Sequence, residues 1–132
     1  MSTAAPGAAV TVFSNAACSK CRTLLGLLGA RGTEYGLVEY LVAPPDRAEL
    51  DALVAKLDGP AADLVRTSDP AFGALGLDPG DYTTAVEVAA LLAEHPELMQ
   101  RPVVVRGDRA IIARPPERVA ELLDDARSGP LG

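Results

Sequence analysis

The sequence predicts an α/β fold in which a β-α-β unit and a β-β-α unit are separated by a helical insertion. Four short apolar runs have the length and composition of strands. They are residues 10–13, 35–41, 102–105 and 109–113. Between the second and third runs, about residues 46–100, apolar side chains recur at helical spacing between capping and turn signals. At 132 residues, 48% of them hydrophobic, the chain suits a single domain with one core over residues 1–132.

The first half of the chain predicts the β-α-β unit. After the strand at 10–13, four leucines between residues 24 and 28 recur at helical spacing, which indicates a helix over about 19–30. Gly32 follows this helix where a C-terminal cap is expected, and the second strand is predicted over 35–41.

The insertion is expected to be helical throughout. Asp46 is a candidate N-cap for a helix with one apolar face that stops at 58–60. Two short helices are predicted over 61–66 and about 69–75, and a stronger one over 83–94.

The last part of the chain predicts the β-β-α unit. The strands at 102–105 and 109–113 are joined by a turn containing Gly107 and Asp108, which favours an antiparallel hairpin. Residues 115–117 then open a final helix. This order of elements is that of a thioredoxin-like fold with a small mixed sheet and a helical insertion between its halves. We expect the ends of the chain, residues 1–9 and 128–132, to be flexible tails.

Cys18 and Cys21, the only cysteines, lie where the first strand gives way to the first helix. The unpaired N–H groups at a helix N-terminus stabilise a thiolate, and Lys20 and Arg22 add positive charge. We therefore expect the pKa of Cys18 to lie below the free-thiol value of about 8.5. A thiolate is a nucleophile and a redox centre, so redox or nucleophilic use is the favoured interpretation.

Three other interpretations of the cysteine pair stay open at this point. The cysteines could be inert core residues, half of a zinc site, or a structural disulfide. Zinc is disfavoured because the chain has no third cysteine and its one histidine, His95, is distant in sequence, so we expect no metal. A disulfide across so short a loop would constrain the unfolded chain little. We interpret His95 as a capping residue at a helix end rather than as a catalytic one.

The charge and hydropathy of the sequence restrict the binding partners and the compartment that we expect. A net charge of −6 argues against a nucleic-acid binder, because phosphate backbones select basic surfaces. No stretch approaches the roughly 20 apolar residues of a membrane span, and residues 1–9 lack the features of a secretory signal. We therefore expect a cytoplasmic monomer with no membrane partner, and a close cysteine pair in a reducing compartment fits catalysis or sensing.

Five ordered blocks carry a resemblance to a known family. They are FSNAACSKCR at 13–22, LVAPP at 41–45, LVRT at 64–67, HPELMQRPVVV at 95–105 and ARPPE at 113–117. Over about residues 10–127 the chain resembles the glutaredoxin-linked arsenate reductase family, called ArsC, and its Spx-type relatives. The resemblance also implies a cis peptide bond before Pro102, as thioredoxin-like folds commonly hold one beside the active cysteine.

The resemblance implies an oxyanion site. In the family, one arginine from each of three blocks surrounds the nucleophile, and the matching positions here are Arg66, Arg101 and Arg114. Arsenate is an anion that repels a thiolate, and guanidinium groups screen that repulsion while offering paired donors to the oxygens. Ser19 is a further candidate, either as a helix cap or as a donor to the bound oxyanion.

The resemblance also implies a mechanism without a bound cofactor. The Cys18 thiolate attacks arsenate, and a thiol system then regenerates the enzyme. In single-cysteine relatives glutathione and glutaredoxin do this, whereas here Cys21 is placed to resolve the adduct as a Cys18–Cys21 disulfide for reduction by glutaredoxin or thioredoxin. Ser14 departs from those family members that carry a histidine at its position, and either Ser14 or Asn15 is a candidate to hydrogen-bond a loop backbone group or the thiolate.

Two other functions stay open. One is an Spx-like regulator that binds RNA polymerase and uses the cysteine pair as a redox switch. Arg114 argues against it, since that lineage typically lacks the arginine-proline block. The other is a general thiol-disulfide oxidoreductase, or a reductase for another oxyanion, because such a pocket recognises charge and tetrahedral shape before element.

Overall fold

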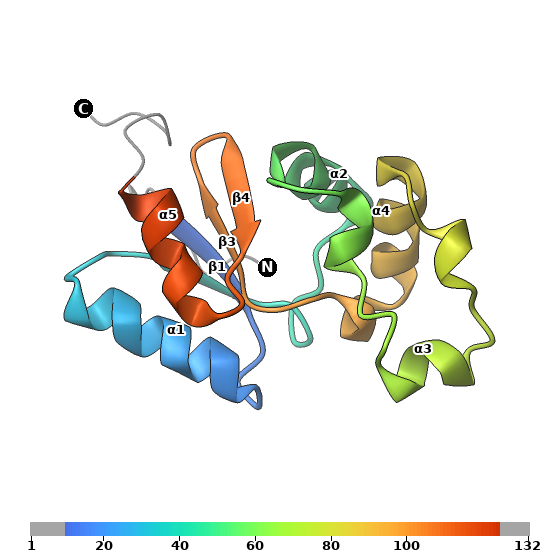
Figure 1. Cartoon of the computed structure of the whole chain (residues 1–132), viewed down its shortest axis with the longest axis horizontal. Helices are drawn as coiled ribbons and strands as arrows, with labels where there is room; N and C mark the ends of the chain where they lie inside the picture. The colour runs from blue at the N-terminus through green and yellow to red at the C-terminus, as the bar shows by residue number, and fades with distance from the viewer. Residues whose placement is uncertain (1–9, 125–132) are drawn as a thin grey trace.

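The computed structural model describes residues 10–124. Four strands form one mixed sheet in the order β2-β1-β3-β4. Strand β1 (Val10–Ser14) is parallel to β2 (Gly36–Glu39) and antiparallel to β3 (Val103–Arg106), and β3 is antiparallel to β4 (Arg109–Ile112). The predicted β-α-β and β-β-α units therefore share a single sheet through the pairing of β1 with β3 (Figure 1).

One face of the sheet packs against α1 (Ser19–Ala30) and α5 (Val119–Leu123), which lie together in Figure 1. Side chains alternate along each strand, so every second residue reaches this core. Its buried members are Val10, Val12, Leu24, Leu28, Val104, Ile111, Ala113, Val119 and Leu122. This core holds α1, and with it the cysteine pair at its N-terminus, against the sheet.

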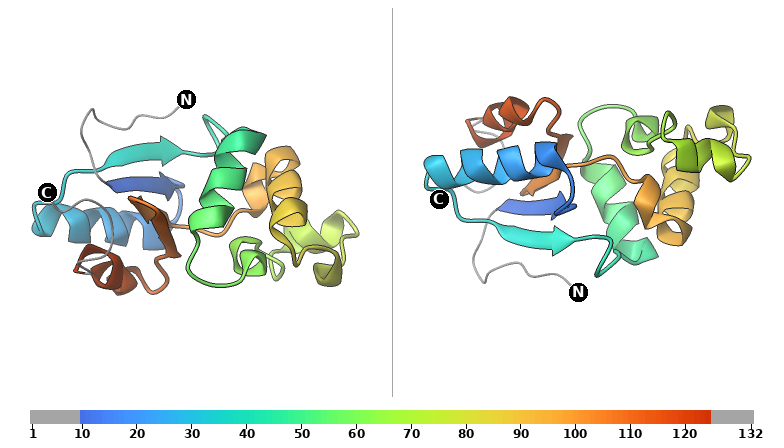
Figure 2. Two further views of the ribbon diagram at one scale, coloured as in Figure 1. Left: turned by 90° about the horizontal axis from the view of Figure 1, so that it is seen from above. Right: turned by 90° about the horizontal axis from the view of Figure 1, so that it is seen from below.

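The opposite face and the carboxyl ends of β1 and β2 pack against the helical insertion, as both views in Figure 2 show. Its helices are α2 (Arg47–Lys56), α3 (Pro70–Ala74) and α4 (Ala85–Glu94). Asp46 and Thr84 each close a capping box, in which the N-cap side chain accepts from the third helical N–H and the glutamate there reaches back. These caps explain where α2 and α4 begin.

Several short 3₁₀ turns complete the chain. They are η1 (Ala61–Leu64), η2 (Pro79–Asp81), η3 (Pro96–Leu98) and η4 (Pro116–Arg118). The helix predicted over 61–66 is therefore wrong in type and length. Val65 instead makes an isolated antiparallel bridge with Met99, and the Arg66 N–H bonds the Leu98 carbonyl, so these residues are extended rather than helical.

Two other boundaries differ from the prediction. The second strand covers only Gly36–Glu39 of the predicted 35–41, because the N–H groups of Val42 and Ala43 both bond the Glu39 carbonyl and turn the chain. The last helix begins as the turn η4 before it becomes α5. The expected cis peptide bond before Pro102 is present, and a second one precedes Pro115.

The expected tails at 1–9 and 128–132 lie outside the described residues. Over residues 10–124, no helix combines the length and apolar character that crossing a membrane requires.

Candidate active site

Chain segments from four strands meet at one edge of the sheet. Because β2 and β4 run in the same direction as β1, and β3 runs opposite, the ends of β1, β2 and β4 lie beside the start of β3. This edge therefore gathers the cysteine loop after β1, Tyr40 after β2, Arg101 before β3 and Arg114 after β4. Three of the sequence blocks that carry cysteine or arginine meet there through topology alone.

Cys18 is the N-cap of α1, with an extended backbone conformation (φ −91°, ψ 123°). Its N–H bonds the Asn15 carbonyl at 2.9 Å, and its own carbonyl accepts from Arg22 at 3.1 Å. The thiol is half-buried and faces the free N–H groups of the first helical turn. The prediction that the cysteine pair opens this helix is confirmed.

The pKa of Cys18 is lowered to about 7. Burial acts in the opposite direction and raises the pKa, but hydrogen bonds to the sulfur outweigh it. They come from the backbone N–H of Cys21, the side chain of Arg101, the thiol of Cys21 and the backbone N–H of Lys20. A substantial fraction of the Cys18 side chains is therefore thiolate at pH 7.

Cys21 lies one helical turn further along and is completely buried. Both cysteines are free thiols. The Asn15 N–H points to the Cys21 Sγ at 3.5 Å. Burial raises the pKa of Cys21, and the negative charge on Cys18 raises it further, although Asn15 and the Ser14 hydroxyl oppose both effects. The two thiols thus differ in role: Cys18 ionises first, and Cys21 remains protonated.

Arg101 is a cation whose side chain bonds the Cys18 sulfur. Burial lowers the pKa of its guanidinium, but the interactions with Cys18 and Tyr40 outweigh that effect, so the pKa is raised and Arg101 stays charged. Its backbone N–H bonds the side-chain oxygen of Gln100 at 3.2 Å. Arg101 therefore supplies both charge and hydrogen bonding to Cys18.

Arg66 and Arg114 are tied to Arg101 indirectly. Arg114 Nη1 donates to the Arg101 backbone carbonyl at 2.8 Å. Arg66 Nη1 donates at 3.2 Å to the Gln100 oxygen that also accepts from the Arg101 N–H, and its Nε donates to Asp69 at 3.2 Å. Within residues 10–124, these two arginines bond such neighbours rather than Cys18. The structure thus joins the three arginines in one cluster, with only Arg101 on the sulfur.

The sequence analysis also singled out Ser19, Lys20 and His95. Ser19 is the first helical residue and is exposed, so the interpretation of Ser19 as the helix cap is wrong, because Cys18 occupies that position. Lys20 is also exposed. His95 caps the end of α4 through its backbone N–H to the Leu91 carbonyl, whereas its ring faces Glu97 at 3.2 Å.

Sequence reasoning missed Tyr40 and Gln100 as members of this cluster. Gln100 lies inside the block at 95–105, and Tyr40 directly precedes the block at 41–45. Their positions within or beside these blocks were the available signal, but a neutral side chain has no charge to single it out. Among residues 10–124, no group of three or more histidine, cysteine or acidic side chains is arranged to hold a metal ion.

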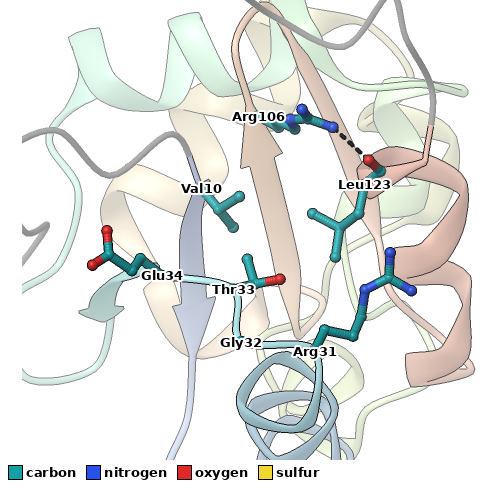
Figure 3. A pocket seen from close by; sticks show the side chains of 7 residues that line it. All are labelled: Val10, Arg31, Gly32, Thr33, Glu34, Arg106 and Leu123. Atoms are coloured by element: carbon teal, nitrogen blue, oxygen red, sulfur yellow. Dashed lines mark hydrogen bonds between the residues drawn. The ribbon is translucent and has the colours of Figure 1, made fainter. Parts of the chain in front are cut away.

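A cavity of about 500 Å³ lies at the other end of α1 from Cys18. Figure 3 shows Arg31 and Thr33 beside it, with Arg106 across from them. Both arginines already have partners: Arg31 pairs with Asp124, and Arg106 donates to the carbonyls of Leu122 and Leu123. The residues that line this cavity include no reactive side chain and no unpaired cation, so we place the candidate active site at Cys18.

Comparison with known proteins shows the family to which the chain belongs. The profile of the ArsC family matches residues 13–122. The chain belongs to the ArsC family. An arsenate reductase of Rhizobium meliloti (strain 1021) is 37% identical over 122 residues, which are 92% of this chain and 86% of that protein. An arsenate reductase of Neisseria meningitidis serogroup A is 36% identical over 115 residues, covering 86% of this chain and 97% of that one.

A solved structure supports the fold. The arsenate reductase from Vibrio cholerae superposes with a TM-score of 0.75 at 34% identity, covering 85% of this chain and 95% of that chain. The predicted thioredoxin-like architecture with a helical insertion is therefore confirmed.

Proposed function

We propose that this protein is an arsenate reductase that converts arsenate to arsenite, with Cys18 as the nucleophile. One observation carries the proposal: the Cys18 thiol has a pKa of about 7 and accepts hydrogen bonds from the Arg101 side chain and from the N-terminus of α1. The same donors that stabilise a thiolate can receive an anion that approaches it. The relatives named arsenate reductase, which match over most of the chain, give the substrate class.

The first step is nucleophilic displacement at arsenic. The Cys18 sulfur forms a bond to arsenic(V), and one As–O bond breaks, its oxygen leaving as water after protonation. Negative charge develops on the arsenate oxygens near Arg101, whose backbone is held in place by the cluster that contains Arg66 and Arg114. Arg66 and Arg114 add their own positive charge, which reduces the repulsion between thiolate and oxyanion.

The second step is reduction by the other cysteine. The Cys21 sulfur attacks the Cys18 sulfur while the Cys21 proton passes to an oxygen on arsenic. The S–S bond forms, and the electron pair of the S–As bond remains on arsenic, which leaves as arsenite. The hydrogen bond between the two thiol groups supports this route, because it places them within reach of each other. An external thiol system of the glutaredoxin or thioredoxin type then reduces the disulfide. We propose the cytoplasm as its compartment, since this regeneration needs a reducing environment.

The test measures arsenite formation by the purified full-length protein. Glutathione with glutaredoxin, and thioredoxin with its reductase, are supplied separately to the wild type, Cys18→Ser and Cys21→Ser. We expect Cys18→Ser to be inactive with both systems, and Cys21→Ser to lose turnover with thioredoxin. Full activity of Cys18→Ser would refute the choice of nucleophile. A wild type that reduces protein disulfides but not arsenate would be a general thiol-disulfide oxidoreductase, and one that is inactive with every donor but binds RNA polymerase would be a regulator.

A further inference from the structure

Tyr40 combines complete burial with an unsatisfied hydroxyl group. The residue follows β2, and its ring belongs to the core between the sheet and the insertion, with 0% of the residue exposed. Within the part of the chain that the structure describes, no group meets full hydrogen-bond geometry with the buried hydroxyl, although the Arg101 side chain is near enough to lower the pKa of the phenol through an imperfect hydrogen bond. A buried polar group without a partner costs free energy, so its presence in a well-packed core calls for a functional explanation.

The second unsatisfied atom is next to the first. Arg101 Nε is also buried without a partner, and no other side-chain nitrogen or oxygen among residues 10–124 shares this condition. The two groups lie close enough for the guanidinium of Arg101 to oppose the burial that raises the pKa of Tyr40. The charges of Cys21 and Arg66 also act on the pKa of the phenol, so Tyr40 lies within electrostatic reach of the second thiol and of the arginine cluster.

An oxyanion beside Cys18 would satisfy both atoms. In the free protein the Arg101 side chain donates to the Cys18 sulfur. A bound oxyanion would compete for the terminal nitrogens of that guanidinium, which would free Arg101 to turn Nε toward the phenol. The phenol oxygen can accept one hydrogen bond while its O–H donates another, which a phenylalanine ring cannot do.

We propose that Tyr40 is a further oxyanion-binding residue, whose hydroxyl accepts a hydrogen bond from Arg101 Nε and donates its own proton to an oxygen of the oxyanion held at Cys18. This inference rests on the proposed function. It adds to the arginine site a neutral donor, the Tyr40 hydroxyl, that selects ligands by hydrogen bonding rather than by charge.

The test uses the protection of Cys18 from alkylation, which requires no electron donor. The full-length protein is treated with iodoacetamide at increasing arsenate concentration, with Cys21→Ser in every form compared so that arsenate cannot oxidise the cysteine pair to a disulfide. The protection curve gives the arsenate Kd for the otherwise wild-type protein, for Tyr40→Phe and for Tyr82→Phe. Each variant is compared with its own rate without arsenate. Tyr82 is the matched control, because its ring packs edge-on against Phe72, with centroids 6.0 Å apart, inside the insertion.

We expect the Kd for arsenate to rise about tenfold in Tyr40→Phe, as the loss of one hydrogen bond to a charged ligand predicts, and to stay unchanged in Tyr82→Phe. Without arsenate, Tyr40→Phe should unfold at an equal or higher denaturant concentration than the wild type, since the change removes an unsatisfied buried hydroxyl. A purely structural tyrosine would instead lose stability and leave the Kd unchanged.

The outcomes separate this inference from the function on which it rests. If arsenate protects the wild type and Tyr40→Phe equally, Tyr40 takes no part in binding and the inference alone is wrong. If arsenate fails to protect the wild type, no oxyanion site exists at Cys18, and both the inference and the proposed function are overturned.

Discussion

The guanidinium of Arg114 donates a hydrogen bond of 2.8 Å to the backbone carbonyl of Arg101. This bond joins the segment after β4 to the segment before β3, at the open end of the hairpin that β3 and β4 form. Because the Arg101 side chain bonds the Cys18 sulfur, Arg114 acts on the thiolate through its neighbour. Arg101 thus contacts the Cys18 sulfur, and Arg114 supports the backbone of Arg101.

Arg114→Ala should raise the pKa of Cys18 above its value of about 7, because the Arg101 backbone loses this support. A return to the free-thiol value of about 8.5 would lower the thiolate fraction at pH 7 about fifteenfold, so we expect a smaller, several-fold fall in the alkylation rate. Thiolate absorbance against pH measures the pKa. Arg106→Ala is the control, since Arg106 also donates to backbone carbonyls but at the opposite end of the sheet. Equal shifts in both variants would contradict a specific role for Arg114.

The alkylation rate of the wild type should rise with pH, reach half of its maximum near pH 7 and level off above it. Cys18→Ser removes this phase, since Cys21 is completely buried. A midpoint near the ordinary thiol value of about 8.5 would show that the donors around Cys18 do not stabilise its thiolate.

The same pKa shift predicts a pH-dependent stability. The folded-state pKa of Cys18, about 7, lies below the reference value of 9.0, so the folded protein binds fewer protons at this group than the unfolded chain does. The stabilisation is therefore complete above about pH 9 and is lost as the pH falls through 7. Urea denaturation should show a larger stability difference between wild type and Cys18→Ser at pH 9 than at pH 6. A constant difference would be inconsistent with this linkage.

Ser14→Ala should raise the pKa of Cys21 further, because the buried hydroxyl of Ser14 is one of the groups that oppose the effect of burial there. Titration of Cys21 thiolate absorbance in a Cys18→Ser background isolates this thiol. We also expect a loss of about 1 kcal/mol in unfolding free energy from the missing hydrogen bond. Ser14→Thr restores a hydroxyl and should recover the lower pKa. If Ser14→Ala leaves the titration unchanged, the serine only fills space.

Thr84→Ala should cost about 1 kcal/mol of unfolding free energy, because Thr84 closes the capping box of α4 by accepting from the Glu87 N–H. Thr83→Ala is the matched control: it alters the adjacent exposed threonine, whose backbone N–H, not its hydroxyl, bonds Glu87. Denaturation curves of the two variants give the comparison. Equal losses would show that the effect comes from helix propensity and not from the cap.

Local patterns in the sequence sufficed for most elements. The helix over 19–30, the hairpin of β3 and β4 and the cap at Asp46 depend on neighbouring residues, and the structure places them as predicted. The prediction was wrong where a distant segment competes. Residues 65 and 66 leave the predicted helix because Met99 and Leu98 bond their backbones, and no pattern within 61–66 records that contact.

The amino-acid sequence by itself determined the chemistry: a cysteine at the start of a helix, a second cysteine one turn later and three arginines in separate blocks. Short-range effects decide these features, because helix N-termini and residue types act on their immediate neighbours. Only the tertiary structure decided three relationships within residues 10–124. Arg101 is the one of the three arginines that contacts the Cys18 sulfur, Arg114 supports Arg101, and the Tyr40 hydroxyl is buried near Arg101 without a hydrogen bond of full geometry. These relationships arise from strand order, which brings residues far apart in the chain to one edge of the sheet. Spacing along the sequence does not show how close such residues lie in space.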